Sequence, residues 1–313
     1  MLIFIGGVQF VTHLPDERPL FLVSGRAVLL KSNTIEKAVK TYKTGSMHSV
    51  RKGMTIDFNQ QNNYISFIKG NNHNSINVFW ITDGNKEVEK SFVLNQLESV
   101  VINTTNDFEL ALVLKRKEDS RKLLIKDILC RIQEKGNIIQ DASNKEGICL
   151  IGHSQIDNWD VTRINSYKTR NCGIKGISSF EYTEHILKHN ILACSEDIYI
   201  IMHGTNDIVY DYSFKEILES IDNTVKYIRK KKNSSRIYFL QCLHVNGRLD
   251  RNNKYIDQLN DYVKTNLKDI YWISTNTLDD EFGNLKAEYT VDGLHLSKEG
   301  YDALLNIIEQ EVV

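Results

Sequence analysis

Residues 148–154 read Ile-Cys-Leu-Ile-Gly-His-Ser. Four apolar residues in a row are typical of a short strand that is buried on both faces, as in a parallel sheet. Gly152 then permits the tight turn that a chain makes as it leaves such a strand, and the turn exposes Ser154. The segment therefore predicts a buried strand that ends in a turn bearing a candidate nucleophile.

The sequence after Gly147 alternates short apolar runs with helical patterns. Further strands are predicted at residues 197–202, 236–240 and 270–273. Between them, residues 214–231 carry apolar side chains at helical spacing, and Ser213 with Glu216 forms a capping box at the start. Strands that alternate with helices predict a doubly wound α/β domain, whose ligand crevice lies beyond the carboxyl ends of the strands.

The first half of the chain, up to about Ile132, shows period-two alternation and no long helical face. Strands are predicted at residues 1–11, 64–68, 76–81, 99–102 and 110–114, with turn residues at 69–72 and 83–85. We therefore expect residues 1–135 to form a β-rich, jelly-roll-like sandwich as an accessory domain. A polar linker at 133–147 would join it to a catalytic α/β domain at 147–313.

The composition agrees with an ordinary soluble protein of about two domains, given roughly 100 to 200 residues per domain. A net charge of -1 in 313 residues gives no electrostatic reason to expect nucleic acid or an anionic membrane as partner. Five cysteines without a Cys-x-x-Cys pair predict buried thiols and no obligatory disulfide. The N-terminal apolar stretch lacks a basic region and a cleavage site, and no run approaches the roughly 20 apolar residues of a membrane helix. These features predict a cytoplasmic protein without a membrane span.

Four short segments of the second half carry the groups that an acyl-transfer reaction needs. Ser154 is the candidate nucleophile, and Asp292 and His295 come from one Asp-x-x-His turn near the C-terminus. A serine hydroxyl attacks when an imidazole takes its proton, and a carboxylate fixes the tautomer of that imidazole. The bare N–H of Gly173 and the side-chain amide of Asn206 can donate to an oxyanion, each worth on the order of 3 kcal/mol.

Each of these residues also has a structural interpretation. Ser154 alone would suit a helix N-cap, and the turn that holds Asp292 and His295 could simply lead into a last helix. Asn206 could form an Asx turn, and Gly173 could be a turn glycine. His185 and His189 are four residues apart but have no evident third ligand, so we predict no metal site.

The order of the four segments resembles the SGNH (GDSL-type) hydrolase family from about Gly147 to the C-terminus. The resemblance implies a flavodoxin-like three-layer α/β/α domain in which Ser154 is the nucleophile, His295 the general base and Asp292 its orienting carboxylate. By the same resemblance, the oxyanion hole consists of the Ser154 N–H, the Gly173 N–H and the Asn206 side chain.

The sequence departs from the family at His153, where the usual residue is aspartate. This departure concerns the local contacts of the turn. The added N-terminal β domain resembles that of some carbohydrate O-acetyl esterases, which is an architectural likeness.

Three functions stay open. The first is a carbohydrate O-acetylesterase that works through an acyl-serine, needs no cofactor, and takes a small-molecule or glycan substrate carrying an O-acyl group. The second is a carbohydrate O-acetyltransferase, acting on a glycan or a sialic acid-type sugar, with acetyl-CoA as donor and the same triad. The third is an inactive glycan-binding protein, and His153 is the feature that favours it.

Overall fold

The computed structural model describes residues 2–5, 20–24, 27, 29–44, 46–51, 78–82, 89–94, 98–102, 104–210 and 212–312. The chain divides into two compact units, Met1–Lys122 and Leu123–Val313, here called unit 1 and unit 2. Helix α3 (Thr105–Glu134) crosses this division. The predicted domain boundaries, 1–135 and 147–313, stay predictions. Within the described ranges, no helix has the length and apolar character needed to cross a membrane.

Unit 2 is built on a six-stranded sheet in the order β11-β10-β9-β6-β8-β7. Its strands are β6 (Ile148–Gly152), β7 (Arg163–Ile164), β8 (Tyr167–Asn171), β9 (Ile198–Met202), β10 (Arg236–Leu240) and β11 (Tyr271–Ile273). All neighbours pair in parallel except β7, which is antiparallel to β8. Numbered along the chain, the parallel strands have the order 2-1-3-4-5, which is the flavodoxin-like arrangement.

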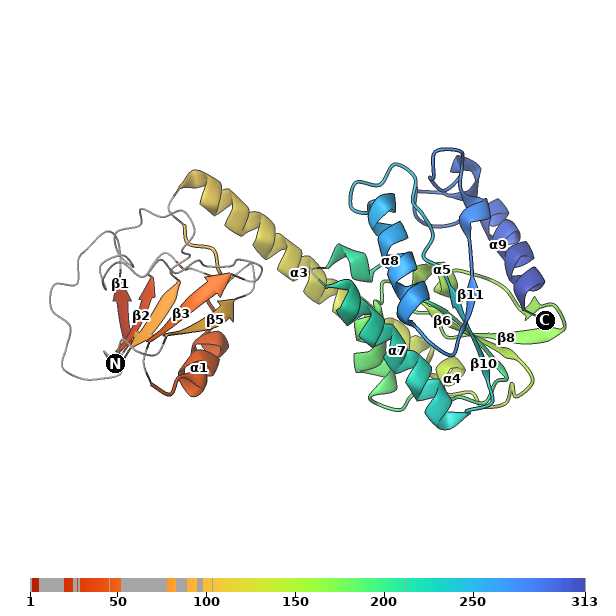
Figure 1. Cartoon of the computed structure of the whole chain (residues 1–313), viewed down its shortest axis with the longest axis horizontal. Coiled ribbons are helices and arrows are strands. Elements are labelled where there is room, and N and C mark those ends of the chain that lie inside the picture. The colour runs from red at the N-terminus through yellow and green to blue at the C-terminus, as the bar shows by residue number, and fades with distance from the viewer. Residues whose placement is uncertain are drawn as a thin grey trace. The chain divides into compact units, whose positions relative to one another are not determined.

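Helices cover both faces of this sheet (Figure 1). The first layer contains the end of α3, α4 (Gly136–Ile139), α6 (Ser179–Tyr182), η1 (Thr183–Leu187), α7 (Phe214–Lys231) and α8 (Asn253–Asn266). The second layer contains η3 (Asn276–Leu278), η4 (Ala287–Tyr289) and α9 (Lys298–Glu311). Two short helices, α5 (Ser154–Asp157) and η2 (Asp207–Val209), follow strands β6 and β9.

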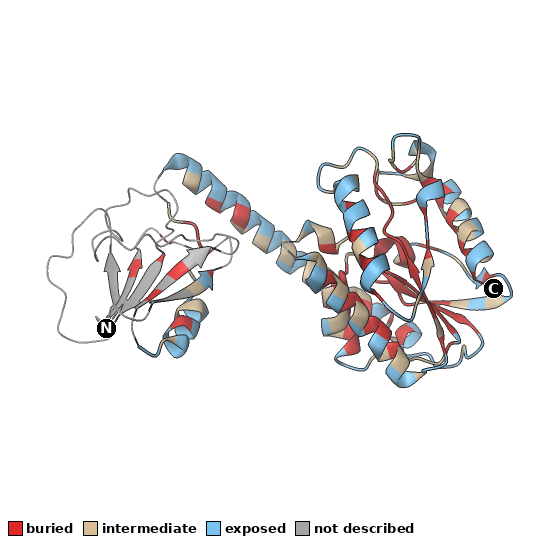
Figure 2. Ribbon diagram, in the orientation of Figure 1, coloured by how far each residue is buried: buried red, intermediate tan, exposed pale blue. Residues whose placement is uncertain are grey.

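The side chains of each central strand alternate between two hydrophobic cores. In β6, Cys149 and Ile151 join the core under α7 and α8, whereas Ile148 and Leu150 join the core under α9. Every residue of β6 and β9 is buried (Figure 2). The unit is therefore a three-layer α/β/α domain, and the α/β prediction for the second half is confirmed.

Local sequence signals account for most of these elements. The predicted strands at 148–151, 197–202, 236–240 and 270–273 correspond to β6, β9, β10 and β11. The predicted helix at 214–231 is α7, and Ser213 and Glu216 form the expected capping box. Four aliphatic residues of α7 at helical spacing are buried, which contributes about 1.5–3 kcal/mol for each.

The described residues of unit 1 form a five-stranded mixed sheet in the order β1-β2-β4-β3-β5, the helix α1 and the first part of α3. These elements are β1 (Leu2–Ile5), β2 (Leu20–Ser24), α1 (Ser32–Thr41), β3 (Ser46–Arg51), β4 (Phe79–Thr82) and β5 (Glu89–Leu94). Ala38, Met47 and Leu94 are buried in its small core. The predicted strand at 64–68 lies outside the described residues, and the β-sandwich stays a prediction.

Three expectations for the region before β6 are wrong. Residues 110–114, predicted as a strand, lie in the 30-residue helix α3, and residues 99–102 form a turn and an extended segment rather than a strand. The apolar run was too short for its period to decide, whereas Thr104 and Asp107 cap the helix start and charged helix formers continue it. Residues 133–147 are not a free linker, because Ile139 of α4 is buried in unit 2.

Candidate active site

The predicted site segments converge at the carboxyl ends of the strands. Ser154 follows β6 and Asn206 follows β9, and these adjacent strands flank the point where the strand order reverses. A Cβ at Gly152 would lie 2.6 Å from the Met202 carbonyl oxygen, so only glycine permits the two strands to approach here. Gly173 follows β8, and the loop before α9 supplies the Asp-x-x-His turn.

The structure brings Ser154, His295 and Asp292 together. The Oγ of Ser154 lies 3.0 Å from Nε2 of His295, and Nδ1 of His295 lies 2.7 Å from Oδ2 of Asp292. Oδ1 of Asp292 accepts hydrogen bonds from the backbone N–H groups of Leu294 and His295 at 2.9 and 2.7 Å. With the Nδ1 proton donated to Asp292, the Nε2 lone pair faces the serine hydroxyl. This is the geometry required for removing the serine proton.

The charge on Asp292 is stabilised by its neighbours. Burial favours a raised pKa, but hydrogen bonds from the His295 N–H, the His295 ring and the Leu294 N–H outweigh it and lower the pKa of Asp292 to about 2. The carboxylate is therefore ionised at any pH near neutrality. An ionised Asp292 fixes the tautomer of His295 and stabilises the imidazolium that forms when His295 takes a proton.

Asn206 is held from two sides. Its Nδ2 donates to the Ile177 carbonyl oxygen at 3.0 Å, and its Oδ1 accepts from Nη2 of Arg251 at 3.2 Å. These contacts use one of the two Nδ2 hydrogens and leave the second for a ligand. Arg251 also donates to the Thr205 carbonyl oxygen at 3.0 Å, and its side chain is only 7% exposed. A buried guanidinium therefore orients the amide and its loop.

The backbone donors of the site differ in their present partners. The Ser154 N–H stands at the start of α5, and none of the described residues accepts a hydrogen bond from it. The Gly173 N–H donates to Oδ1 of Asn171 at 3.0 Å, so Gly173 would have to exchange this bond to serve an oxyanion.

A second glycine in the same turn has a free N–H. Gly176 has a φ of +80°, and no group within the described ranges accepts a hydrogen bond from its N–H. It precedes Ile177, whose carbonyl oxygen holds the Asn206 amide. Gly176 is the second glycine of the turn at 171–176, and its positive φ lets the chain reach Ile177, which holds Asn206.

Comparison with known proteins identifies the fold and the broad family of unit 2. Residues 156–303 match the model of the GDSL-like Lipase/Acylhydrolase family, a span that begins just after Ser154 and includes Asn206, Asp292 and His295. Unit 2 carries a GDSL-like lipase/acylhydrolase domain. An esterase or related acyl-transfer enzyme is the class of activity that this family supports.

A solved structure with a TM-score above 0.5 agrees with the fold of this GDSL-like domain. A protein from Streptococcus pneumonia, provisionally named a platelet activating factor, is 24% identical; the match covers 64% of this chain and 98% of that chain with a TM-score of 0.56. A GDSL-like lipase from Bacteroides thetaiotaomicron is 22% identical, with 57% and 94% coverage and a TM-score of 0.45.

A curated relative is similar over a longer stretch. The N-acylneuraminate cytidylyltransferase of Escherichia coli O18:K1:H7 is 39% identical over 225 residues, which is 71% of this chain and 53% of the relative. The match is longer than either unit, so it includes parts of both. The chain spans about half the length of this relative.

His153 takes the place of the aspartate expected in the GDSL-like domain, and it caps α5. Its Nδ1 accepts a long hydrogen bond, 3.4 Å, from the Gln155 N–H. Burial lowers the pKa of His153 to about 3, helped by His203 and by the positive charge of Arg251. The imidazole is therefore neutral near pH 7, and a neutral ring can accept the Gln155 hydrogen bond. The substitution is compatible with the local turn.

Asp207 supports the loop that carries Asn206. Its Oδ1 accepts from the N–H and hydroxyl of Ser179 at 3.0 and 2.6 Å, and its Oδ2 accepts from the Gly204 N–H at 3.0 Å. Burial raises the pKa of Asp207 to about 6 despite these hydrogen bonds. Three donors aimed at one buried carboxylate fix the loop between β9 and η2.

The end of α3 supports the opposite side of the site. Nζ of Lys135 donates to the Gly173 carbonyl oxygen at 2.8 Å and lies 2.9 Å from Oδ1 of Asp157. Arg131 donates to both oxygens of Asp157, at 3.0 and 2.8 Å, and the Asp157 side chain is only 2% exposed. Arg131 of α3 and Lys135, the N-cap residue of α4, thus hold the end of α5 and the Gly173 turn in place.

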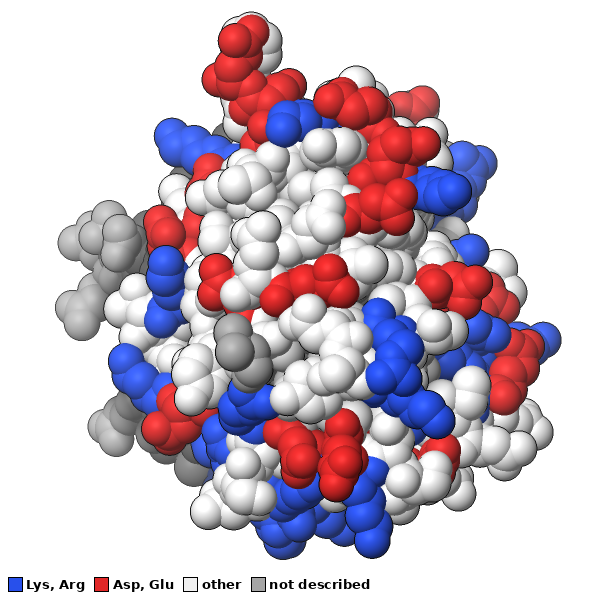
Figure 3. Space-filling view, turned by 90° about the vertical axis from the view of Figure 1, so that its right-hand side faces the viewer, with Lys and Arg blue, Asp and Glu red and all other residues white. Residues whose placement is uncertain are grey.

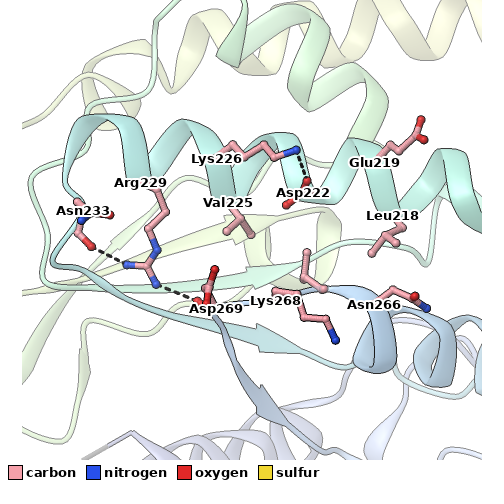
Figure 4. A pocket seen from close by; sticks show the side chains of 11 residues that line it. Leu218, Glu219, Asp222, Val225, Lys226, Arg229, Asn233, Asn266, Lys268 and Asp269 are labelled. Carbon is pink, nitrogen blue, oxygen red and sulfur yellow. Dashed lines mark hydrogen bonds and ion pairs between the residues drawn. The ribbon is translucent and has the colours of Figure 1, made fainter.

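A groove of about 810 Å³ lies at the other end of the sheet, between α7 and the end of α8 (Figure 4). It contains the Lys226–Asp222 ion pair, and Arg229 donates to the carbonyl oxygens of Asn233 and Asp269. These contacts close a loop at the amino ends of β10 and β11. No triad residue lines this groove, so it is not the candidate active site.

The face of the molecule drawn in Figure 3 has no large patch of one charge. Acidic and basic side chains are interspersed over the face drawn in Figure 3, in keeping with the net charge of -1. Among the residues that the structure describes, no group of three or more His, Cys, Asp or Glu side chains could hold a metal ion.

Proposed function

We propose that this chain is a serine esterase that removes an O-acetyl group from a carbohydrate. One observation carries the proposal: Ser154 Oγ lies 3.0 Å from His295 Nε2, and Asp292 holds the other nitrogen of the same ring at 2.7 Å. An activated serine beside free N–H donors is suited to attack on an ester carbonyl. The family match of residues 156–303 supports the same class of reaction.

The reaction would proceed in two halves. Ser154 Oγ bonds to the ester carbonyl carbon while His295 takes the serine proton, and the tetrahedral oxyanion is held by the Ser154 N–H and the Asn206 amide. The ester C–O bond then breaks, and His295 gives its proton to the departing sugar hydroxyl. In the second half, water bonds to the acyl carbon and loses a proton to His295. The bond from the acyl carbon to Ser154 Oγ then breaks, His295 returns the proton to Oγ, and acetate leaves.

The sugar we propose is an O-acetylated N-acylneuraminate. The support is the relative named N-acylneuraminate cytidylyltransferase, which is 39% identical over 225 residues. The likeness favours the same sugar class. We do not extend it to nucleotidyl transfer, because this chain spans about half of that relative. Serine–imidazole chemistry acts on acyl carbon, so we expect no cytidylyl transfer from CTP by this chain.

The same acyl-serine could pass its acetyl group to a sugar hydroxyl, with acetyl-CoA as donor. An inactive glycan-binding protein, the third reading, is disfavoured by the contacts among the three triad side chains. Product analysis separates these functions, because the esterase releases acetate, the transferase releases free coenzyme A only with an acceptor, and the binding protein releases neither.

The deciding experiment uses the purified full chain with an O-acetylated N-acylneuraminate, an aryl acetate and acetyl-CoA as separate substrates. Acetate release that is lost in Ser154→Ala supports the esterase. Thiol release from acetyl-CoA that requires an N-acylneuraminate acceptor would replace it with the transferase. Activity that survives unchanged in Ser154→Ala would remove Ser154 from the mechanism.

A further inference from the structure

Two arginines and one aspartate form a cluster on the loop that follows β10. Arg248 donates to both carboxylate oxygens of Asp250, at 2.8 and 3.0 Å. Arg251 pairs with Asp250 as well. The cluster therefore holds two positive charges against one negative charge. It retains a net positive charge even when all its internal ion pairs are formed.

This loop lies directly against the candidate active site. The Asn246 N–H donates to the Gly293 carbonyl oxygen at 2.8 Å, and a Cβ at Gly293 would lie 3.4 Å from Cγ of Arg248. Gly293 is the residue after Asp292 of the triad. At the other end of the loop, Arg251 contacts Asn206 and the Thr205 carbonyl oxygen. The cluster thus extends from the triad turn to the oxyanion-hole loop.

The two arginines have different capacities for a ligand. Arg251 is 7% exposed, and Nε, Nη1 and Nη2 each donate to a protein oxygen. Arg248 is 34% exposed, and its Nη1 has no acceptor among the residues that the structure describes. Arg248 is therefore the member of the cluster whose guanidinium can reach a bound molecule, while Asp250 fixes its orientation.

We propose that Arg248 binds the carboxylate of an acidic sugar while the acetyl ester of that sugar lies at Ser154. The inference rests on the proposed esterase function and names the group that would select its substrate. A guanidinium with free N–H donors matches a carboxylate in shape and charge. Asp292 attracts Arg248 through its charge, but the hydrogen bonds of Arg248 within the described residues go to Asp250, so its Nη1 stays available to a ligand.

The test compares two substrates that differ only in charge. One is an O-acetylated N-acylneuraminate, and the other is the same sugar with its carboxylate converted to a carboxamide. The wild-type chain should prefer the acid in kcat/KM. In Arg248→Ala this preference should fall about 10- to 100-fold, as expected for losing a charged hydrogen-bond donor. Arg248→Lys should retain part of the preference, because it keeps the charge and loses the planar fork.

Arg163→Ala is the matched control, because Arg163 is an exposed arginine of β7 that donates to the Ser166 carbonyl oxygen. It should leave the acid preference unchanged. If Ser154-dependent hydrolysis shows the same preference in Arg248→Ala as in the wild type, the carboxylate subsite is refuted and the esterase stands. If hydrolysis does not depend on Ser154, the esterase proposal itself fails.

Discussion

Replacing Arg251 by alanine should slow hydrolysis by loosening the Asn206 amide. In the structure, Nη2 of Arg251 lies 3.2 Å from Oδ1 of Asn206. Nδ2 of Asn206 uses one hydrogen to donate to the Ile177 carbonyl oxygen, so the fixed amide keeps its second hydrogen for a ligand. A hydrogen bond from a charged donor contributes about 1.5–3 kcal/mol. At about 1.4 kcal/mol per factor of ten, kcat should fall about 10- to 100-fold. The effect should stay below the roughly 10²- to 10³-fold loss expected for Asn206→Ala.

The assay is a double-mutant cycle on an aryl acetate, which carries no carboxylate and so avoids any contribution from Arg248. Arg251 acts through Asn206 in this reasoning, so Arg251→Ala should cost little in the Asn206→Ala background. The loss should lie in kcat rather than KM, and thermal melting of each variant shows that the assay temperature is below its unfolding transition. Costs of Arg251→Ala that are equal in both backgrounds would refute the positioning role.

Three further predictions concern the triad and two buried histidines. Ser154→Ala and His295→Ala should each reduce aryl acetate turnover by several orders of magnitude, whereas Asp292→Asn should retain more residual rate; equal rates in all three would break the triad assignment. Burial lowers the pKa of His203 to about 3, so its neutral form stabilises the fold above the unfolded pKa of about 6.5, and this stability is lost as pH falls toward 3. His203→Phe should therefore flatten the acid limb of a plot of melting temperature against pH. His244 has the opposite sign, because hydrogen bonds from its ring to Asp279, at 2.9 Å, and to Asp257, at 2.8 Å, raise its pKa. The contribution of His244 to the free energy of unfolding is fully present below about pH 6.5 and is lost as pH rises through the pKa of the folded state. His244→Gln should therefore lower the melting temperature more at pH 6 than at pH 9.

Sequence patterns predicted the elements whose period is unambiguous. The helical spacing of α7 allows one secondary structure, and Gly152 directly after the apolar run of β6 favoured a strand there. The family resemblance carried by the four segments implied that Ser154, Asp292 and His295 would meet, and their side chains do. The run at 110–114 failed because five apolar residues fit a strand or one helical turn, and the residues around it decide.

Contacts made in three dimensions were beyond the reach of these patterns. The bond from the Gly173 N–H to Asn171 Oδ1 depends on the path of the turn, and Arg251 comes from a loop without a motif. Among the described residues the Gly176 N–H has no acceptor, which likewise follows from its backbone conformation. Such contacts depend on the path of a loop in space, which no sequence pattern gives.

The two cations at the end of α3 determine where this protein can be shortened. A chain that starts at residue 147 would lack Arg131 and Lys135, and the buried carboxylate of Asp157 would lose both of its ionic partners. Leaving a buried charge uncompensated in this way costs about 3–5 kcal/mol. Expression of unit 2 alone should therefore succeed from about residue 123 and yield a weakly stable product from residue 147, although both versions contain Ser154, Asp292 and His295.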